Sequence, residues 1–453
     1  MPVRPLLALL TFSILLAQTP QTSADETANW PQFRGPNVDG VSEVALLPST
    51  WDTSKNVRWR ADTAGRGWSS PVVWGDRIFL TTVVRVGESE APKKGLYFGG
   101  DRPKPPEDVH QWRVLCLDLN TGAKLWDYLA HEAPPKSAIH LKNSFASETP
   151  VVDAERIYAY FGNLGVFCLD HDGKPLWDHT IEPHKMQLGW GTASSPALHD
   201  GVLYIVNDNQ EESYLMALDA ASGKQKWKIP RDEKSNWATP FIWQNDQRTE
   251  VITSGKLIRS YNLAGEELWQ LGDNSSIIIP TPFATNGLLY VSSGYVLNPR
   301  KPVYAIQPGA SGDITLAKEE STNQAIRWSQ PKAGPYNTSP LVYQGHLYVL
   351  YDRGFFACYD AATGEMIYDR QRLPEGRAFT ASPWAHNGKI FCLNEYGITF
   401  VLKAGPEFEI LHTNTLAPDA MCMATPAVAG NNLLIRTETS LYCLQEGATS
   451  EQE

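Results

Sequence analysis

Short apolar stretches alternate with turn residues at regular intervals along most of the chain. After a Ser/Thr-Pro pair, an apolar run such as 72–74 leads to a turn such as Gly75-Asp76 and then to a second apolar run, Ile78-Phe79-Leu80. Gly, Asn and Asp supply the positive φ angles that a tight hairpin requires. A third strand ends at an Asp turn and a fourth carries Trp, so each unit is predicted to be four antiparallel strands, the blade of a propeller.

The Ser/Thr-Pro pair recurs eight times, which makes the chain a repeat protein. The pairs are Ser70-Pro71, Thr149-Pro150, Ser195-Pro196, Thr239-Pro240, Thr281-Pro282, Ser339-Pro340, Ser382-Pro383 and Thr425-Pro426. The steps between successive prolines are 79, 46, 44, 42, 58, 43 and 43 residues. Most steps match the roughly 40–50 residues of one four-stranded blade. The two long steps predict insertions at 85–111 and 309–323.

The turn between the third and fourth strands carries the most regular motif. Five units place Gly four residues before an aromatic side chain, at Gly122/Trp126, Gly173/Trp177, Gly223/Trp227, Gly265/Trp269 and Gly364/Tyr368. Gly permits the left-handed turn, and the aromatic ring can wedge between adjacent blades. The predicted docking residues are Trp59, Trp126, Trp177, Trp227, Trp269, Trp328 and Tyr368.

The two ends of the repeat complement one another. The last unit, 425–444, supplies three strands and lacks a docking Trp, whereas residues 56–60 form an isolated strand that contains Trp59. Pairing them completes the last blade and removes exposed edges. We therefore predict an all-β fold, an eight-bladed β-propeller whose last blade is closed by an N-terminal strand. Seven blades with a separate terminal hairpin is the alternative.

This motif resembles the PQQ-like β-propeller repeat, which quinoprotein dehydrogenases share with the BamB family of outer-membrane assembly factors. The resemblance covers nearly all of the chain after residue 24, and residues 30–37 are similar to the start of exported bacterial PQQ-like proteins. In the alcohol-oxidising quinoproteins, the resemblance implies PQQ held against a disulfide between adjacent cysteines, a Ca²⁺ ion with oxygen ligands, and an Asp base. No two cysteines are adjacent here, so we expect no cofactor, with PQQ and Ca²⁺ as the alternative.

Net charge and the N-terminal sequence indicate which classes of partner and which location are expected. The net charge of −11 disfavours a nucleic-acid surface, which needs clustered Lys and Arg. Arg4 and the apolar residues 6–16 predict a signal peptide over 1–24, followed by a lead-in segment over 25–55, the propeller over 56–446 and a disordered tail over 447–453. The signal peptide predicts a periplasmic or secreted protein. Because no cysteine precedes Cys116, no lipid anchor is expected. We also expect no membrane span and a monomeric protein.

Four of the six cysteines occupy one slot of the repeat, at Cys116, Cys168, Cys358 and Cys443. Equivalent slots in neighbouring blades lie about 10 Å apart, whereas a disulfide needs Cα atoms within roughly 7 Å. These four are therefore predicted to be single buried thiols. The pattern does not place Cys392 and Cys422.

The loops predict which face of the disc binds. One face collects the first-to-second and third-to-fourth turns, which are stereotyped. The other, here called the mouth face, collects the fourth-to-first and second-to-third connections, whose length and composition vary, so function is expected there. The insertion at 85–111 lies on the mouth face, as a solvated loop or as a lid or partner arm. The polar insertion at 309–323 lies on the opposite face and is predicted to be mobile.

Aromatic and polar residues precede the Ser/Thr-Pro pairs, where the innermost strands begin. A rim of this kind suits ligand binding, although the same rings could instead pack between blades. The predicted rim is Trp68, Phe145, Trp190, Trp237, Asn274, Tyr336, Asn337, Arg377 and Phe379, with Arg66, Lys142 and Asn143 nearby.

The sequence lacks the common catalytic motifs. It has no His-Glu-x-x-His or His-x-His pattern, no Gly-x-Ser-x-Gly elbow and no phosphate loop. It therefore predicts a non-catalytic exported scaffold that binds an envelope protein or a small ligand. A PQQ-dependent dehydrogenase and a carbohydrate-binding propeller are the two alternatives.

Overall fold

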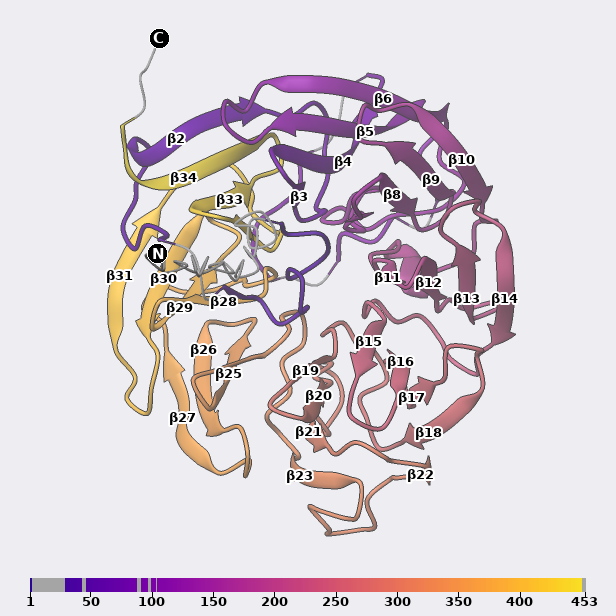
Figure 1. The fold of residues 1–453 in the computed structure, drawn as a ribbon, viewed down its shortest axis with the longest axis vertical. Coiled ribbons are helices and arrows are strands. Elements are labelled where there is room, and N and C mark those ends of the chain that lie inside the picture. The colour runs from indigo at the N-terminus through magenta and orange to yellow at the C-terminus, as the bar shows by residue number, and fades with distance from the viewer. Residues whose placement is uncertain (2–28, 43–45, 88–90, 97–98, 103, 450–453) are drawn as a thin grey trace.

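The computed structural model describes residues 1, 29–42, 46–87, 91–96, 99–102 and 104–449. In these residues the strands form eight sheets arranged in a ring (Figure 1), which confirms the predicted eight-bladed propeller. The predicted signal peptide lies outside the described residues apart from Met1. In the described part of the chain, the one helical element is the short 3₁₀ turn η2 (Gln187–Gly189), and no helix is long and apolar enough to cross a membrane.

The first four blades follow one another along the chain, each with its innermost strand first. Blade 1 is β3 (Val72–Trp74), β4 (Arg77–Arg85), β5 (His110–Asp118) and β6 (Lys124–Ala133). Blade 2 is β7 (Val151–Val152), β8 (Arg156–Phe161), β9 (Gly165–Asp170) and β10 (Pro175–Thr180). Blade 3 is β11 (Ala197–His199), β12 (Val202–Asn207), β13 (Tyr214–Asp219) and β14 (Gln225–Pro230). Blade 4 is β15 (Phe241–Gln244), β16 (Thr249–Thr253), β17 (Ile258–Tyr261) and β18 (Glu267–Leu271).

The remaining blades repeat this order. Blade 5 is β19 (Phe283–Thr285), β20 (Leu288–Ser292), β21 (Val303–Ile306) and β23 (Ile326–Gln330). Blade 6 is β24 (Leu341–Tyr343), β25 (His346–Tyr351), β26 (Phe355–Asp360) and β27 (Met366–Arg372). Blade 7 is β28 (Trp384–His386), β29 (Lys389–Leu393), β30 (Ile398–Lys403) and β31 (Ile410–Thr415). Blade 8 is β32 (Ala427–Ala429), β33 (Asn432–Arg436), β34 (Ser440–Thr449) and β2 (Lys55–Asp62).

The ring closes between the two ends of the chain, as predicted. Strand β2 pairs antiparallel with β34, with Trp59 opposite Cys443 and Asp62 opposite Ser440. The two strands lie side by side in Figure 1 although they come from opposite ends of the sequence. Strand β34 extends to Thr449, so the last blade continues three residues past the predicted boundary at 446. The alternative of seven blades is excluded.

The lead-in segment crosses the inner end of the ring. The backbone of Trp30 pairs with Val73 of blade 1, and Gly40 accepts a hydrogen bond from Ala385 of blade 7. Strand β1 (Val41–Ser42) then adds to β28 in parallel. Between them, the fully buried Arg34 donates to Pro340 O of blade 6 at 2.7 Å. The indigo strand in the middle of Figure 1 is this segment, which ties together blades that are far apart in the sequence.

Two residues of the insertion at 309–323 pair with a neighbouring sheet. Within it, β22 (Gly312–Asp313) pairs in parallel with β18, so blade 4 gains a fifth strand from the blade 5 connection. Ile314 is buried in the core between these blades, and Thr315 Oγ1 accepts a hydrogen bond from Gly272 N at 2.8 Å. Apolar burial and backbone pairing order a segment whose polar sequence suggested a loop.

Candidate functional site

The mouth face carries a cavity of about 460 Å³ above blades 8, 1 and 2, here called the mouth cavity. Its walls come from four connections: 65–66 between β2 and β3, 139–145 between β6 and β7, 438–439 between β33 and β34, and, between β4 and β5 with their ends, residues 83–85, 91, 102, 104, 106 and 110. All four connections emerge on the face that the sequence predicted to be functional. The cavity therefore lies where loop variation is greatest.

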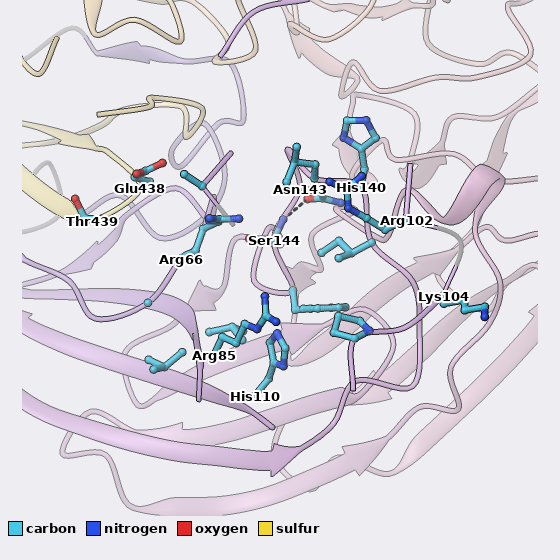
Figure 2. Close-up of a pocket in the computed structure, with 18 residues that line it drawn as sticks. Arg66, Arg85, Arg102, Lys104, His110, His140, Asn143, Ser144, Glu438 and Thr439 are labelled. Atoms are coloured by element: carbon cyan, nitrogen blue, oxygen red, sulfur yellow. Dashed lines mark hydrogen bonds between the residues drawn. The ribbon is translucent and has the colours of Figure 1, made fainter. Parts of the chain in front are cut away.

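Cationic side chains dominate the polar part of this wall. Of the described residues that line the mouth cavity, four are Arg or Lys and one, Glu438, is acidic; the cations are Arg66, Arg85, Arg102 and Lys104. Figure 2 shows Arg66 and Arg85 pointing toward the middle of the cavity from two sides, with Lys104 farther out. Burial raises the pKa of Glu438, and the charges of Arg66 and Lys94 oppose that shift.

Arg85 is held at the floor of the cavity. It forms an ion pair with Asp108, whose carbonyl oxygen lies 2.8 Å from Nδ1 of His110. The Nε atom of Arg85 is buried and has no hydrogen-bond partner among the residues that the structure describes. Burial lowers the pKa of His110 and also of His140 in the opposite wall, so both imidazoles are neutral near pH 7. The positive charge of the cavity thus comes from the guanidinium and ammonium groups.

The insertion between β4 and β5, residues 86–109, lies across the mouth face. On the blade 7 side, Gly95 N donates to Glu395 Oε2 at 2.8 Å, and Lys94 Nζ donates to Pro418 O at 2.7 Å. On the blade 3 side, Trp190 Nε1 donates to Asp101 Oδ1 at 2.7 Å. The described part of the insertion is therefore tied to connections on two sides of the mouth face.

A buried polar cluster lies beneath the insertion. Glu395, which is fully buried, accepts hydrogen bonds at Oε1 from Lys142 Nζ at 2.5 Å and from Thr380 Oγ1 at 2.8 Å. Lys142 Nζ also donates to Gly95 O at 3.0 Å. Lys142 and Glu395 therefore each bind both the other and the insertion, and they fix the backbone at Gly95. We call these two side chains the clasp.

Most of the predicted docking residues contact the next blade around the ring. Trp126 Nε1, for example, donates to His171 O of blade 2 at 2.9 Å, and the ring lies against Gly173. The same hydrogen bond to the next blade is made by Trp59, Trp177, Trp227 and Trp328. Trp269 differs, because its Nε1 donates to Glu250 within its own blade, and Tyr368 packs against Phe408.

Comparison with known proteins identifies the family of this propeller. The family model described as outer membrane protein assembly factor BamB matches residues 48–186, 110–236 and 165–314, which together make up more than half of the chain. The chain belongs to the PQQ-like propeller family.

The individual proteins similar to this PQQ-like propeller include two dehydrogenases and one BamB. A polyvinylalcohol dehydrogenase from a Pseudomonas species is 23% identical over 312 residues, which cover 64% of this chain and 39% of that protein. The chain therefore spans about two fifths of the length of this curated relative. BamB from Moraxella catarrhalis is 11% identical with a TM-score of 0.54, covering 81% of this chain and 99% of that one. The quinohemoprotein alcohol dehydrogenase of Pseudomonas putida is 13% identical with a TM-score of 0.60, covering 95% and 82%.

Three of the predicted rim residues gather in one apolar cluster on the mouth face of the PQQ-like propeller. Trp190 and Trp237 pack with ring centroids 5.7 Å apart, and Tyr336 lies 5.4 Å from the ring of Tyr295. Trp237 is buried, whereas Trp190 and Tyr336 keep part of their surface exposed. This cluster lies over blades 3 to 6, and the mouth cavity over blades 8, 1 and 2.

The other predicted rim residues are scattered. Phe145 lines the mouth cavity, and Trp68 is buried with its Nε1 donating to Lys142 O at 2.7 Å. Phe379 is completely buried against Phe400, so its ring offers no surface at the mouth. The last three make contacts outside the mouth cavity and the aromatic cluster. Asn274 donates its side-chain amide to the carbonyl oxygens of 271 and 272, and Asn337 donates its backbone N–H to Asp352. Arg377 stacks over Tyr396.

The residues of this PQQ-like propeller do not match the donor set that the quinoprotein resemblance implies. All six cysteines are buried single thiols, including Cys392 and Cys422, which the repeat could not place. Among the described residues no group of three or more His, Cys, Asp or Glu is arranged to hold a metal ion.

Sequence reasoning missed most of the mouth cavity. Arg85, Arg102, Lys104 and His110 lie in or beside the insertion, which has no counterpart in other blades. Arg66 and Lys142 were noted beside the predicted rim, because they precede Ser/Thr-Pro pairs. The available signal was the presence of five Arg or Lys residues within 85–104 of an acidic chain.

Proposed function

We propose that this PQQ-like propeller is an exported, non-catalytic binding module that holds a small ligand or an envelope partner at its mouth face. The observation that carries the proposal is the mouth cavity of about 460 Å³, bounded by the insertion. Ligand pockets typically enclose about 300–1,000 Å³ with a few polar groups set among apolar walls. The cavity meets both conditions.

A rigid frame supports a binding role. Buried ion pairs fix the mouth-face connections of blades 3 and 4, with Arg231 Nε 2.8 Å from Asp208 and Arg259 bound to Glu233. The docking tryptophans join neighbouring blades on the other face. A preorganised site loses less entropy when a ligand binds.

A PQQ-dependent dehydrogenase is the second candidate, favoured by the match to polyvinylalcohol dehydrogenase. It requires the chain to bind PQQ without the adjacent-cysteine disulfide. A carbohydrate-binding propeller is a third reading, favoured by the paired rings of Trp190 and Trp237.

A dye-linked assay separates binding from catalysis. The purified protein is incubated with PQQ and Ca²⁺ and then offered a primary alcohol or polyvinyl alcohol with an artificial electron acceptor. We expect no substrate-dependent dye reduction above the rate without PQQ. Sustained reduction that requires both PQQ and substrate overturns the proposal and establishes the dehydrogenase.

A further inference from the structure

The described lining of the mouth cavity is mainly cationic, although the protein is acidic. The whole chain carries −11, whereas the described residues that line the cavity include four Arg or Lys side chains and one carboxylate. A low-dielectric cleft lined by one sign of charge concentrates ligands of the opposite sign. An acidic protein gains no solubility from gathering its cations in a recess, so the arrangement points to a ligand.

The guanidinium of Arg85 gives a second indication. Its Nη2 engages Asp108, yet 33% of the side-chain surface stays exposed, and the side chain points into the cavity (Figure 2). A guanidinium carries five N–H donors, so the ion pair with Asp108 leaves others that can donate to an oxyanion in the cavity.

Apolar side chains also line the cavity. Val83, Val84, Ile139, Leu141 and Phe145 line the cavity together with the cations. Planar guanidinium groups bind carboxylate, sulfate and phosphate oxygens in pairs, and the apolar side chains suit a carbon skeleton. A bare inorganic anion would leave these apolar groups without contacts.

We infer that the mouth cavity binds a small organic molecule that carries two or more oxyanion groups, held by Arg66 and Arg85 with Arg102 at the edge of the insertion. The inference rests on the proposed function, because it assigns a ligand class to the same cavity. Lys104, at the outer edge, contributes to the local charge.

Calorimetric titration of the full chain tests the ligand class. The probes are citrate for carboxylates, a sugar bisphosphate for phosphates, a sulfated disaccharide for sulfates, and maltose as a neutral molecule of similar size. We expect at least one anion to bind, maltose not to bind, and the affinity to fall when NaCl is raised from about 0.05 to about 0.5 M, because salt screens charge.

Two variants and one control locate the binding. Arg66→Gln and Arg85→Gln are each expected to weaken the anion about tenfold or more, since each removes charged hydrogen bonds. Lys224→Gln removes an exposed cation from the β13–β14 turn on the opposite face and is expected to leave the affinity unchanged. Melting temperatures of all three variants check that the fold is intact.

The outcomes separate this inference from the proposed function. The ligand class is wrong if no anion binds, if maltose binds as tightly, or if Arg66→Gln and Arg85→Gln both bind like the parent protein. None of these results would demonstrate catalysis, so the proposed binding function would still stand. PQQ-dependent dye reduction overturns the proposed function whatever the titrations give.

Discussion

An indole ring from the neighbouring blade lies over the glycine of several third-to-fourth-strand turns. A Cβ atom added to Gly122 would lie 2.6 Å from Cε3 of Trp59, and one added to Gly173 would lie 2.7 Å from Cδ2 of Trp126. From the sequence, the left-handed turn alone accounts for glycine at these positions. The structure adds close approach as a second reason.

Paired substitutions separate the two reasons. Gly122 and Gly201 have φ of 73° and 70°, but a Cβ at Gly201 would meet nothing within 4 Å. Gly201→Ala is expected to destabilise by roughly 1–2 kcal/mol through φ alone. Gly122→Ala is expected to cost about 1–3 kcal/mol more, because the methyl group displaces Trp59. Equal losses in urea unfolding would mean that the indole contact has no energetic weight.

Glu148 predicts a pH effect on stability. It is fully buried, and burial raises its pKa from 4.5 to about 7, although hydrogen bonds from Thr192 and Gly162 oppose the shift. The folded chain therefore retains a proton that the unfolded chain releases, so this group's stabilisation is present below pH 4.5 and is lost as the pH rises to about 7.

Glu148→Gln removes that loss, since the amide oxygen can still accept from Gly162. We expect the variant to gain stability relative to the parent protein at pH 8, by up to a few kcal/mol, and to gain little at pH 4.5. Thermal unfolding at both pH values measures the difference, with the exposed Glu407→Gln as the control. A relative stability that does not change with pH would contradict the prediction.

At the scale of elements, the insertion is the part that departs most from the repeat. Its contacts reach from Trp190 near blade 3 to Glu395 in blade 7, and the clasp joins residues 253 positions apart. Substituting Lys142 by Gln removes the cation that faces a buried carboxylate and should release the backbone at Gly95.

The expected result of Lys142→Gln is faster cleavage within 86–109 during limited proteolysis, by several-fold, with the rest of the ring protected. Local opening exposes a loop to protease without global unfolding. Lys224→Gln, on the opposite face, serves as the control. Cleavage of the insertion at the rate of the parent protein would show that the clasp does not hold it.

The elements that sequence predicted are those that repeat. The second strands at 203–205, 289–291, 347–349 and 390–392 all lie within β12, β20, β25 and β29. The path of the insertion and the pairing of β22 could not be predicted, because each depends on contacts made once in the molecule. Hydrophobic periodicity reports local burial and does not report which distant segment supplies it. For the same reason the cations of the mouth cavity were found only from the structure, apart from Arg66.

At the scale of the whole molecule, β2 covers the outer edge of β34, and two truncations test its role. Removing residues 1–54 deletes the lead-in segment but keeps β2, whereas removing 1–62 deletes both and leaves β34 without its partner. An unpaired edge strand favours association. We expect the 1–62 deletion to form larger species in light scattering and the 1–54 deletion to do so much less. Equal behaviour of the two would place the protection in the lead-in segment.

The way the ring closes also dictates an order of events. Arg60 and Ser440, which join β2 to β34, are 380 positions apart. Synthesis delivers β2 well before β34, so β2 must wait for its partner until the blades between them have been made. Non-local pairings of this kind are also slow to form. Completion of blade 8 therefore follows the synthesis of the other seven blades, and until β2 and β34 meet the ring keeps a gap.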